Sequence, residues 1–286
     1  MSQTPTSTST STKVYLGSQV AYEKELAFAK TLALEAGEIM RHYFRSAQLL
    51  THEKQDHTPL TIADTKINEM VVQQVQRRFP GHGVIGEEAS YEPTRAAVWV
   101  VDPIDGTSPF VCGIPVSTFS LALVSRTDGQ PCVSATYDPY LDELMFATKG
   151  GGAFCGAQPL TTSRGQDLAG QYVSQGSGLW SHRATVDIGT MVSKLHAADV
   201  RGFNFISAVY GARQVARGNF VAGFLLYGSP WDSAAAALLV SEAGGVVSDI
   251  FGQQRRYDEF ANGLLVSCNQ TVHDKMLQIF RESAVR

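Results

Sequence analysis

The sequence predicts a mixed α/β (α+β) fold, and three stretches of the chain carry this prediction. Two early stretches, residues 22–45 and 61–79, place apolar side chains at the three- and four-residue spacing of amphipathic helices. Residues 83–148 then hold short apolar runs separated by turns with Gly or Asp, which is typical of a sheet. The rest of the chain alternates strand-like and helix-like segments. We therefore expect helices first, then a sheet, then a mixed second part.

The expected elements follow in order along the chain. The first helix covers residues 22–45, and the second, residues 61–79, is ended by Pro80 and Gly81. The glycines at 150–152 indicate a turn, because no helix clearly follows them as a phosphate-binding loop requires. Strands are expected at 83–85, 96–101, 117–124, 131–138, 143–148, 172–174, 220–226, 246–247 and 264–266. Later helices are expected at 185–197, 207–217, 232–243 and 272–283.

The composition fits a globular protein with a sizeable core. The chain has 286 residues, of which 44% are hydrophobic and 17% charged, and its net charge is −4. This charge favours neither a nucleic-acid nor a membrane partner, and no run reaches the roughly 18 apolar residues of a membrane helix. Residues 1–13 are rich in Ser and Thr without an apolar centre, so we expect a disordered tail and no secretion signal.

The four cysteines are scattered along the chain and lack the spacing of a zinc site. We interpret them as reduced thiols, which indicates a cytoplasmic protein. They are Cys112, Cys132, Cys155 and Cys268.

The most informative segment runs from Trp99 to Thr107 and reads Trp-Val-Val-Asp-Pro-Ile-Asp-Gly-Thr. An apolar strand leads into two carboxylates, Asp102 and Asp105, and Pro103 biases the first toward extended backbone. Two acids held close together repel unless a cation lies between them, and hard divalent cations prefer carboxylate oxygens. An Asp-rich turn after a strand is the alternative, and this segment alone leaves the two equally favoured.

Three further segments favour the metal site. Glu87 and Glu88 end an apolar run, Asp232 follows Trp at a helix start, and Asp64 lies at another helix start. In order, Gly-Glu-Glu, Trp-x-x-Asp-Pro-Ile-Asp-Gly-Thr, and Trp-Asp followed by Glu-Ala-Gly-Gly match the pattern of one family. From about residue 23 to its end, the chain resembles the inositol monophosphatase family of magnesium-dependent phosphatases.

The resemblance implies a layered αβαβα sandwich of the inositol monophosphatase / fructose bisphosphatase type and two or three Mg²⁺ ions. It implies that Glu87, Asp102 and the Ile104 carbonyl hold one ion. A second ion would be held by Asp102, Asp105 and Asp232, and a weaker third would lie near Glu87. For any single acid, a solvated surface group is the common alternative. The set is harder to explain that way, because each acid lies beside apolar strand or helix residues.

The resemblance also implies which residues act on water and substrate. In the family a threonine and an aspartate orient the attacking water, and Thr107 and Asp64 match them here, with Glu87 as the third predicted catalytic residue. Asp64 has a compatible structural alternative, as the partner of Thr61 in a helix capping box. The phosphate is expected on backbone N–H groups near Gly106. The residues predicted to bind substrate are Asp105, Gly106, Thr107, Ser108, Ala208, Leu225 and Asp232.

The sequence departs from the family pattern in the region that sets substrate specificity. Inositol-using members place a glutamate shortly before Trp-Asp, where this chain has Leu225, and an apolar residue cannot replace hydroxyl recognition. Pro109 and Ile206 also replace a usual Asn and a common Gly. These departures argue against inositol itself. Arg213 has two interpretations: it contacts an anionic group of the substrate or of a second subunit, or it lies on a solvated helix face.

We therefore predict a cytoplasmic Mg²⁺-dependent phosphomonoesterase that hydrolyses a small phosphorylated metabolite and, as the resemblance implies, forms a homodimer. Histidinol phosphate, fructose 1,6-bisphosphate and 3′-phosphoadenosine nucleotides are alternative substrates to inositol 1-phosphate. A regulatory protein on the same scaffold is the non-enzymatic alternative, but it would be expected to lack metal-binding acids. Two halves are expected: residues 14–168, with most of the metal ligands, and residues 169–286, with Asp232 and the specificity region.

Overall fold

The structure is a computed structural model that describes residues 22–54, 57–176 and 185–285. The tail predicted at residues 1–13 lies outside the described residues. Within the described ranges, no helix combines the length and the apolar character needed to cross a membrane.

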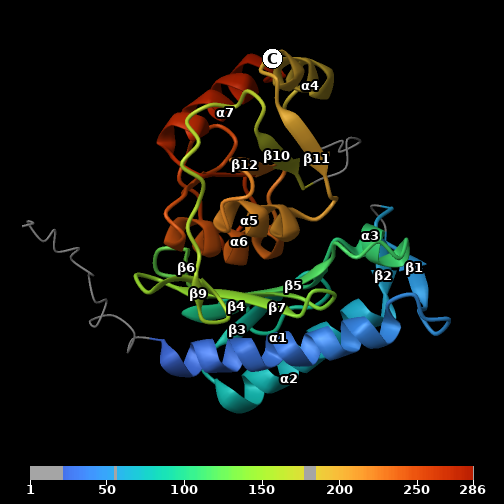
Figure 1. Cartoon of the computed structure of the whole chain (residues 1–286). Helices are drawn as coiled ribbons and strands as arrows, with labels where there is room; N and C mark the ends of the chain where they lie inside the picture. The colour runs from blue at the N-terminus through green and yellow to red at the C-terminus, as the bar shows by residue number, and fades with distance from the viewer. Residues whose placement is uncertain (1–21, 55–56, 177–184, 286) are drawn as a thin grey trace, which may run out of the picture.

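The elements form five layers, alternately helical and sheet (Figure 1). Helices α1 (Glu23–Tyr43) and α2 (Ile62–Arg78) cover one face of a seven-stranded sheet. Helices α5 (Ala208–Ala216) and α6 (Pro230–Glu242) lie between this sheet and a five-stranded sheet. Helices α4 (Ile188–Ala197) and α7 (Gln270–Glu282) form the outer layer beyond the second sheet. This arrangement is the αβαβα sandwich that the resemblance implies.

The seven-stranded sheet carries the segment from Trp99 to Thr107. Its strands follow one another in chain order, with the first pair parallel and the others antiparallel. They are β3 (Gly83–Gly86), β4 (Ala97–Asp105), β5 (Thr118–Ser125), β6 (Gln130–Asp138), β7 (Glu143–Thr148), β8 (Gly152–Cys155) and β9 (Gln158–Pro159). Along β4, Trp99 and Val101 pack in the core with α1 and α2, whereas Val98 and Val100 pack in the core with α6. Because side chains alternate along a strand, Asp102 lies on the α6 face.

The five-stranded sheet has the order β11-β10-β12-β14-β13. Its strands are β10 (Tyr172–Gln175), β11 (Arg201–Asn204), β12 (Ala222–Leu225), β13 (Val246–Ser248) and β14 (Leu264–Ser267). Strand β10 is parallel to both of its neighbours, and β14 is antiparallel to β12 and β13. The predicted boundary between residues 168 and 169 falls in the connection between the two sheets, and the division into halves stays a prediction.

Helix α6 connects the two sheets because it is apolar on all sides. Its four alanines, residues 234–237, are at most 3% exposed, and the Ser134 hydroxyl of β6 donates to the carbonyl of Ala235. A helix that is hydrophobic around its whole circumference is stable only when both faces are covered. Pro230 begins the helix at a position where the missing N–H costs no helical hydrogen bond.

Several predicted local features are confirmed. Thr61 and Asp64 form the capping box of α2, and residues 149–151 form a turn between β7 and β8. Helix α4 begins only at Ile188, three residues later than predicted, because the Asp187 carboxylate caps it by accepting from the N–H of Thr190.

The sequence-based map omitted the hairpin of β1 (Thr51–Glu53) and β2 (Pro59–Thr61), strand β11 and helix α3 (Thr107–Val111), as well as strands β8 and β9. Every residue of β1 and β11 is exposed. Such strands have no buried face, so their sequences carry no alternation of apolar and polar residues that would indicate them.

Candidate active site

Three carboxylates meet where β4 ends and α6 begins. Asp102 and Asp105 are among the last four residues of strand β4 and are 2% and 3% exposed. Asp232 is the third residue of α6. Each offers one oxygen atom, and these three oxygens lie within 4.8 Å of one another. The strand register shifts between Asp102 and Asp105, next to Pro103, which has no N–H to give to the ladder. We refer to Asp102, Asp105 and Asp232 as the three-carboxylate group.

Burial disfavours the charged forms of these acids. Burial raises the pKa of Asp105 to about 6 and, together with the charges of Asp105 and Glu87, raises the pKa of Asp232 to about 7. The pKa of Asp102 is raised by burial first and then by the neighbouring acids. A cation among the three would remove this repulsion, and an all-oxygen donor set suits Mg²⁺. The residues present therefore fit the ion that the sequence predicts.

Asp105 also holds the start of α5. Its carboxylate accepts hydrogen bonds from the Ser207 hydroxyl and from the N–H groups of Ala208 (3.0 Å), Val209 (2.9 Å) and Tyr210 (3.3 Å). These N–H groups have no partner inside the helix, and a carboxylate at a helix N-terminus also interacts favourably with the helix dipole. One residue of the first half thus fixes a helix of the second half. The structure brings Ala208 to the three-carboxylate group through this contact.

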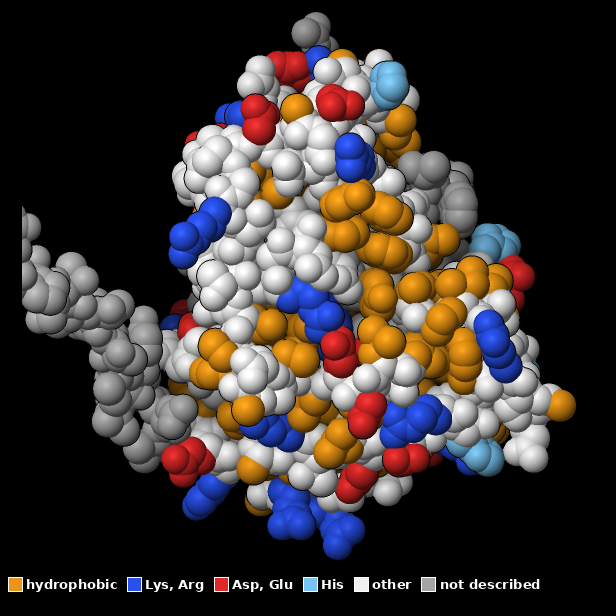
Figure 2. All heavy atoms as spheres, viewed as in Figure 1, with side chains coloured by type: hydrophobic (Ala, Val, Ile, Leu, Met, Phe, Trp, Pro, Cys, Tyr) orange, Lys and Arg blue, Asp and Glu red, His pale blue; other side chains and the backbone are white. Residues whose placement is uncertain are grey.

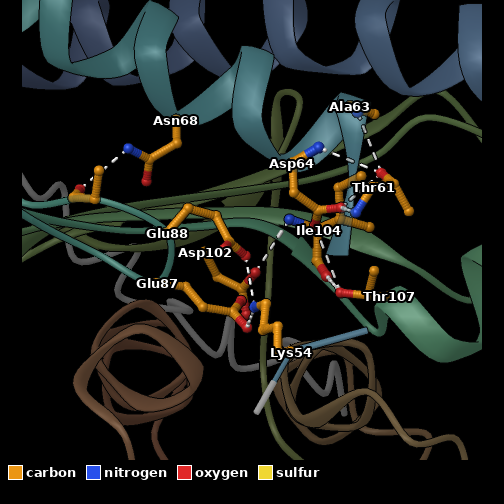
Figure 3. Close-up of polar contacts among 11 residues, drawn as sticks. Lys54, Thr61, Ala63, Asp64, Asn68, Glu87, Glu88, Asp102, Ile104 and Thr107 are labelled. Carbon is orange, nitrogen blue, oxygen red and sulfur yellow. Dashed lines mark hydrogen bonds and ion pairs between the residues drawn. The ribbon is translucent and has the colours of Figure 1, made fainter. Parts of the chain in front are cut away.

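Asp64 and Thr107 lie close to each other and near Asp102, as Figure 3 shows. The Thr107 hydroxyl is 3.5 Å from Oδ1 of Asp64 and donates to the Ile104 carbonyl at 3.1 Å. The other Asp64 oxygen accepts from the N–H and the hydroxyl of Thr61 at 2.8 and 2.6 Å. Burial raises the pKa of Asp64 to about 7. Capping therefore occupies one oxygen of Asp64 and leaves the other turned toward Thr107.

Glu87 lies outside the three-carboxylate group and is paired with a lysine that sequence reasoning missed. The Lys54 ammonium is 2.7 Å from Glu87 and 2.7 Å from Glu88 (Figure 3). Burial lowers the pKa of Lys54, but the two glutamates outweigh it and raise the pKa overall. Lys54 lies at the end of β1, and no motif in the exposed hairpin indicates that it reaches Glu87. The charge of Glu87 still acts on Asp102 and Asp232.

Gly106 is the turn between β4 and α3, and its backbone requires a glycine. Its φ is +85°, and a Cβ there would lie 3.0 Å from the Ser207 side chain. Thr107 and Ser108 follow as the first residues of α3, and all three residues are half-buried. The predicted phosphate-binding backbone thus lies next to the three-carboxylate group.

Two residues from the specificity region lie elsewhere than expected. Leu225 is 3% exposed and packs in the core between the two sheets. Both interpretations of Arg213 are wrong, because its side chain is buried and donates to the carbonyls of Thr136 and Glu143 at 2.9 and 3.0 Å. Ile206, where family members often have Gly, adopts a φ of +52° that favours glycine.

Comparison with known proteins shows the family of the chain. The sequence pattern of the inositol monophosphatase family matches residues 21–284. Inositol monophosphatase 1 of Solanum lycopersicum is 32% identical over 244 residues, which are 81% of this chain and 86% of that protein. The histidinol-phosphatase of Chlorobaculum parvum is 32% identical over 237 residues, 82% of this chain and 89% of that protein.

Solved structures show the same fold. The extragenic suppressor protein SuhB from Bartonella henselae aligns with a TM-score of 0.81 and 25% identity, covering 91% of this chain and 99% of that one. The matches extend over both sheets and over every residue of the three-carboxylate group. This chain belongs to the inositol monophosphatase family.

Proposed function

We propose that this protein hydrolyses small phosphate monoesters in a Mg²⁺-dependent reaction at the three-carboxylate group. The observation that carries the proposal is the convergence of Asp102, Asp105 and Asp232 beside the Asp64–Thr107 pair. Membership of the inositol monophosphatase family supports it, since relatives at 32% identity are named an inositol monophosphatase and a histidinol-phosphatase. A regulatory protein on this scaffold would have no need to keep these buried acids together.

The residues that would hold two or three Mg²⁺ ions are Glu87, Asp102, Asp105, Asp232 and the Ile104 carbonyl. Bound Mg²⁺ neutralises phosphate charge and makes a coordinated water more acidic. Asp102 would contribute to holding more than one ion, because its carboxylate interacts electrostatically with Glu87, Asp105 and Asp232. Lys54, which pairs with Glu87 at 2.7 Å, would have to release this carboxylate for Glu87 to hold an ion.

Thr107 and Asp64 orient the attacking water and take its proton. A general base works best when its pKa lies near the working pH, and the pKa of Asp64, at about 7, meets this condition. The free side of its carboxylate faces the Thr107 hydroxyl. The first N–H groups of α3, beginning at Gly106, are proposed to hold the phosphate oxygens, with Ser108 next to them.

A phosphate-release assay tests this function. The purified protein is incubated with inositol 1-phosphate, histidinol phosphate, fructose 1,6-bisphosphate and 3′-phosphoadenosine 5′-phosphate, each with Mg²⁺ and with excess chelator. We expect release from at least one ester with Mg²⁺ and none with chelator. Release that is equal in chelator, or none from any ester, would refute the proposal.

The substrate itself is proposed to be a small metabolite that is not inositol phosphate. The family pattern supports this, because inositol-using members place a glutamate shortly before Trp-Asp, whereas this chain has Leu225 there, an apolar side chain packed in the core that offers a substrate hydroxyl no acceptor. Named relatives at the same 32% identity include both an inositol monophosphatase and a histidinol-phosphatase, so identity does not separate these substrates. The net charge of −4 favours a small molecule over a nucleic acid.

We also propose a cytoplasmic homodimer. All four cysteines are free of disulfides, as expected in a reducing compartment. Hydrophobic side chains gather over β10, β11 and α3 on the face in Figure 2. Exposed there and nearby are Tyr172, Val192, Phe203, Val111 and Ile114. Light scattering should give twice the 30.9 kDa mass of the chain. Phe203→Glu should reduce the measured mass to that of one chain. Leu141→Glu, at an exposed site in the turn between β6 and β7, should leave the mass of the dimer unchanged.

A further inference from the structure

Arg255 is a buried cation without a carboxylate partner. It lies between β13 and β14 and is 5% exposed. Among the residues that the structure describes, no carboxylate oxygen comes within 4.0 Å of its nitrogens, whereas its neighbour Arg256 pairs with Asp258. Taking a guanidinium out of water without an ion-pair partner is costly, so its position calls for an explanation.

The guanidinium is satisfied by oxygens near the beginning of α6 and by two carbonyls of its own loop, those of Arg256 and Glu259. Nη1 donates to the Gly263 carbonyl at 2.7 Å and to the Ser233 hydroxyl at 3.1 Å, and Nη2 donates to the Gly228 carbonyl at 3.4 Å. Gly228 and Ser233 lie on either side of Asp232 along the chain. Arg255 therefore connects the segment that leads into α6 with the first turn of that helix, and Asp232 is the last of the four residues between these two anchors.

The chain leaves space for this contact. A Cβ on Gly228 would lie 2.3 Å from Nη1 of Arg255, although the backbone there is not in the left-handed region. A glycine is thus needed at this position for close approach and not for its conformational freedom. Gly228 and Ala261 also exchange two backbone hydrogen bonds, of 3.1 and 2.9 Å, which hold the segment against the Arg255 loop.

The Arg255 loop is itself anchored to the first sheet. Gln130 at the start of β6 donates to the Arg255 carbonyl at 3.0 Å, and the Tyr257 N–H donates to the Gly129 carbonyl at 2.8 Å. The guanidinium also lies over the Tyr257 ring, 5.0 Å from its centroid. Because the loop is fixed to the sheet that carries Asp102 and Asp105, it fixes Asp232 relative to them.

The charge of Arg255 acts on the same carboxylate. Burial lowers the pKa of Arg255, whereas the charges of Tyr257, Asp232 and Asp249 favour its charged form. Arginine stays protonated in proteins even under such conditions. A fixed positive charge behind Asp232 offsets part of the repulsion that arises when three acids are brought together without an ion.

We propose that Arg255 is the positioning residue for Asp232: it locks the start of α6 so that Asp232 points at Asp102 and Asp105 before any Mg²⁺ binds. This inference rests on the proposed function, because it assigns a role to Arg255 in forming the Mg²⁺ site. Groups that orient metal ligands in this way affect metal affinity by about 10- to 100-fold.

The test is calorimetric titration of Mg²⁺ into the metal-free full-length protein and its variants. Arg255→Lys keeps the charge but cannot reach Gly228, Ser233 and Gly263 together, and we expect Mg²⁺ affinity to fall about 10- to 100-fold. Ser233→Ala removes one contact in a helix already rich in alanine, and we expect a fall of about threefold to tenfold. Arg256→Met is the matched control, since it breaks the Asp258 pair in the same loop, and its affinity should equal that of the unaltered protein.

Two further readouts separate positioning from simple loss of stability. In metal-free Arg255→Lys, hydrogen exchange at the amides of residues 231–233 should speed up, whereas the amides of α7 should be unchanged. In activity assays the Mg²⁺ concentration for half-maximal rate should rise, while the KM for the phosphate ester at saturating Mg²⁺ stays within about twofold. If Arg255→Lys does not fold, Ser233→Ala decides by the same measurements.

The outcomes distinguish the two proposals. If the unaltered protein binds no Mg²⁺, the proposed function fails. If it binds Mg²⁺ and both Arg255→Lys and Ser233→Ala bind it equally well, the assignment of Arg255 is overturned and the proposed function stands. If Arg256→Met lowers the Mg²⁺ affinity as much as Arg255→Lys does, the assignment is also overturned, because the effect would then come from the loop as a whole.

Discussion

At the scale of single residues, Asp102 occupies the central place in the site. It is 2% exposed, and its pKa is raised by burial and by Glu87, Asp105 and Asp232 together. Its Oδ1 accepts from the Ile104 N–H at 3.0 Å, which turns the side chain toward the end of β4. A residue that interacts with all the other acids is the one whose neutralisation should affect metal binding most.

We therefore expect Asp102→Asn to lose measurable binding of the principal Mg²⁺ ions, because an amide removes the charge and one oxygen donor. Calorimetry with the metal-free protein measures this. Asp138→Asn is the matched control: Asp138 is also a buried acid with a raised pKa, but it lies on β6, two strands from β4, and its carboxylate caps the turn at Tyr140 and Leu141. Unchanged Mg²⁺ affinity in Asp102→Asn would contradict its assignment.

Thr107 has a different role from the acids, since its hydroxyl lies between Asp64 and the Ile104 carbonyl. Thr107→Ala should leave Mg²⁺ affinity unchanged and lower kcat by roughly two to four orders of magnitude, the range for losing a positioned proton acceptor. Ser108→Ala, which alters the next side chain but keeps the backbone, should retain most of the activity. Near-normal kcat in Thr107→Ala would remove this residue from the mechanism.

At the scale of elements, the strands and helices with a buried face were predictable and those without one were not. The capping box of α2 was predicted because Thr61 and Asp64 have the required spacing. The hairpin that carries Lys54 is exposed throughout β1, and its importance comes from a contact with Glu87 that lies more than 30 residues away. Contacts of this kind depend on tertiary structure, so a local pattern does not indicate them.

Leu225 illustrates the limit of alignment within an element. The position was predicted from its distance to Trp-Asp along the chain, but the direction of a side chain on a strand alternates with each residue. In β12, Leu225 pairs with Leu264 and faces the core between the sheets. Chain distance placed it near the substrate, whereas the register of β12 places it in the core.

This placement changes what Leu225→Glu should do. A carboxylate in this core has no partner to replace its hydration, so we expect the variant to lose about 3 kcal/mol or more of unfolding free energy. Urea unfolding followed by circular dichroism measures this. Leu225→Met, which conserves volume, should cost less than about 1.5 kcal/mol. A stable Leu225→Glu protein with improved hydrolysis of inositol 1-phosphate would show instead that the side chain reaches the substrate.

At the scale of the whole molecule, the layers bring together acids that the chain keeps apart. Asp102 and Asp105 belong to the first sheet, Asp64 to the first helical layer and Asp232 to the central one. The motifs alone predicted this set, because each has a distinctive local sequence. The geometry of this set of acids depends on how the layers pack. It includes the hydrogen bonds of Asp105 to the start of α5 and the proposed positioning of Asp232 by Arg255.

Gathering these acids has a consequence for the pH dependence of stability. In the metal-free protein the pKa of Asp64 and that of Asp232 are about 7 and that of Asp105 is about 6, all above their ordinary value of 3.8. The folded state therefore binds more protons than the unfolded state between about pH 4 and pH 7, and its stability falls as the pH rises through that window.

We thus expect the melting temperature of the metal-free protein to be lower at pH 8 than at pH 5.5, by roughly 5 °C or more. Saturating Mg²⁺ should remove most of this difference, because the ion binds the deprotonated acids and replaces the protons that they lose. Asp102→Asn weakens the repulsion among the acids. Without metal, its melting temperature should therefore fall less between pH 5.5 and pH 8, and Mg²⁺ should not restore it. Calorimetric melting at both pH values, with chelator and with Mg²⁺, measures all three effects. If the metal-free protein were instead more stable at pH 8, the buried carboxylates would have to be charged and already stabilised by groups of the protein itself, and Mg²⁺ would not be needed to hold them together.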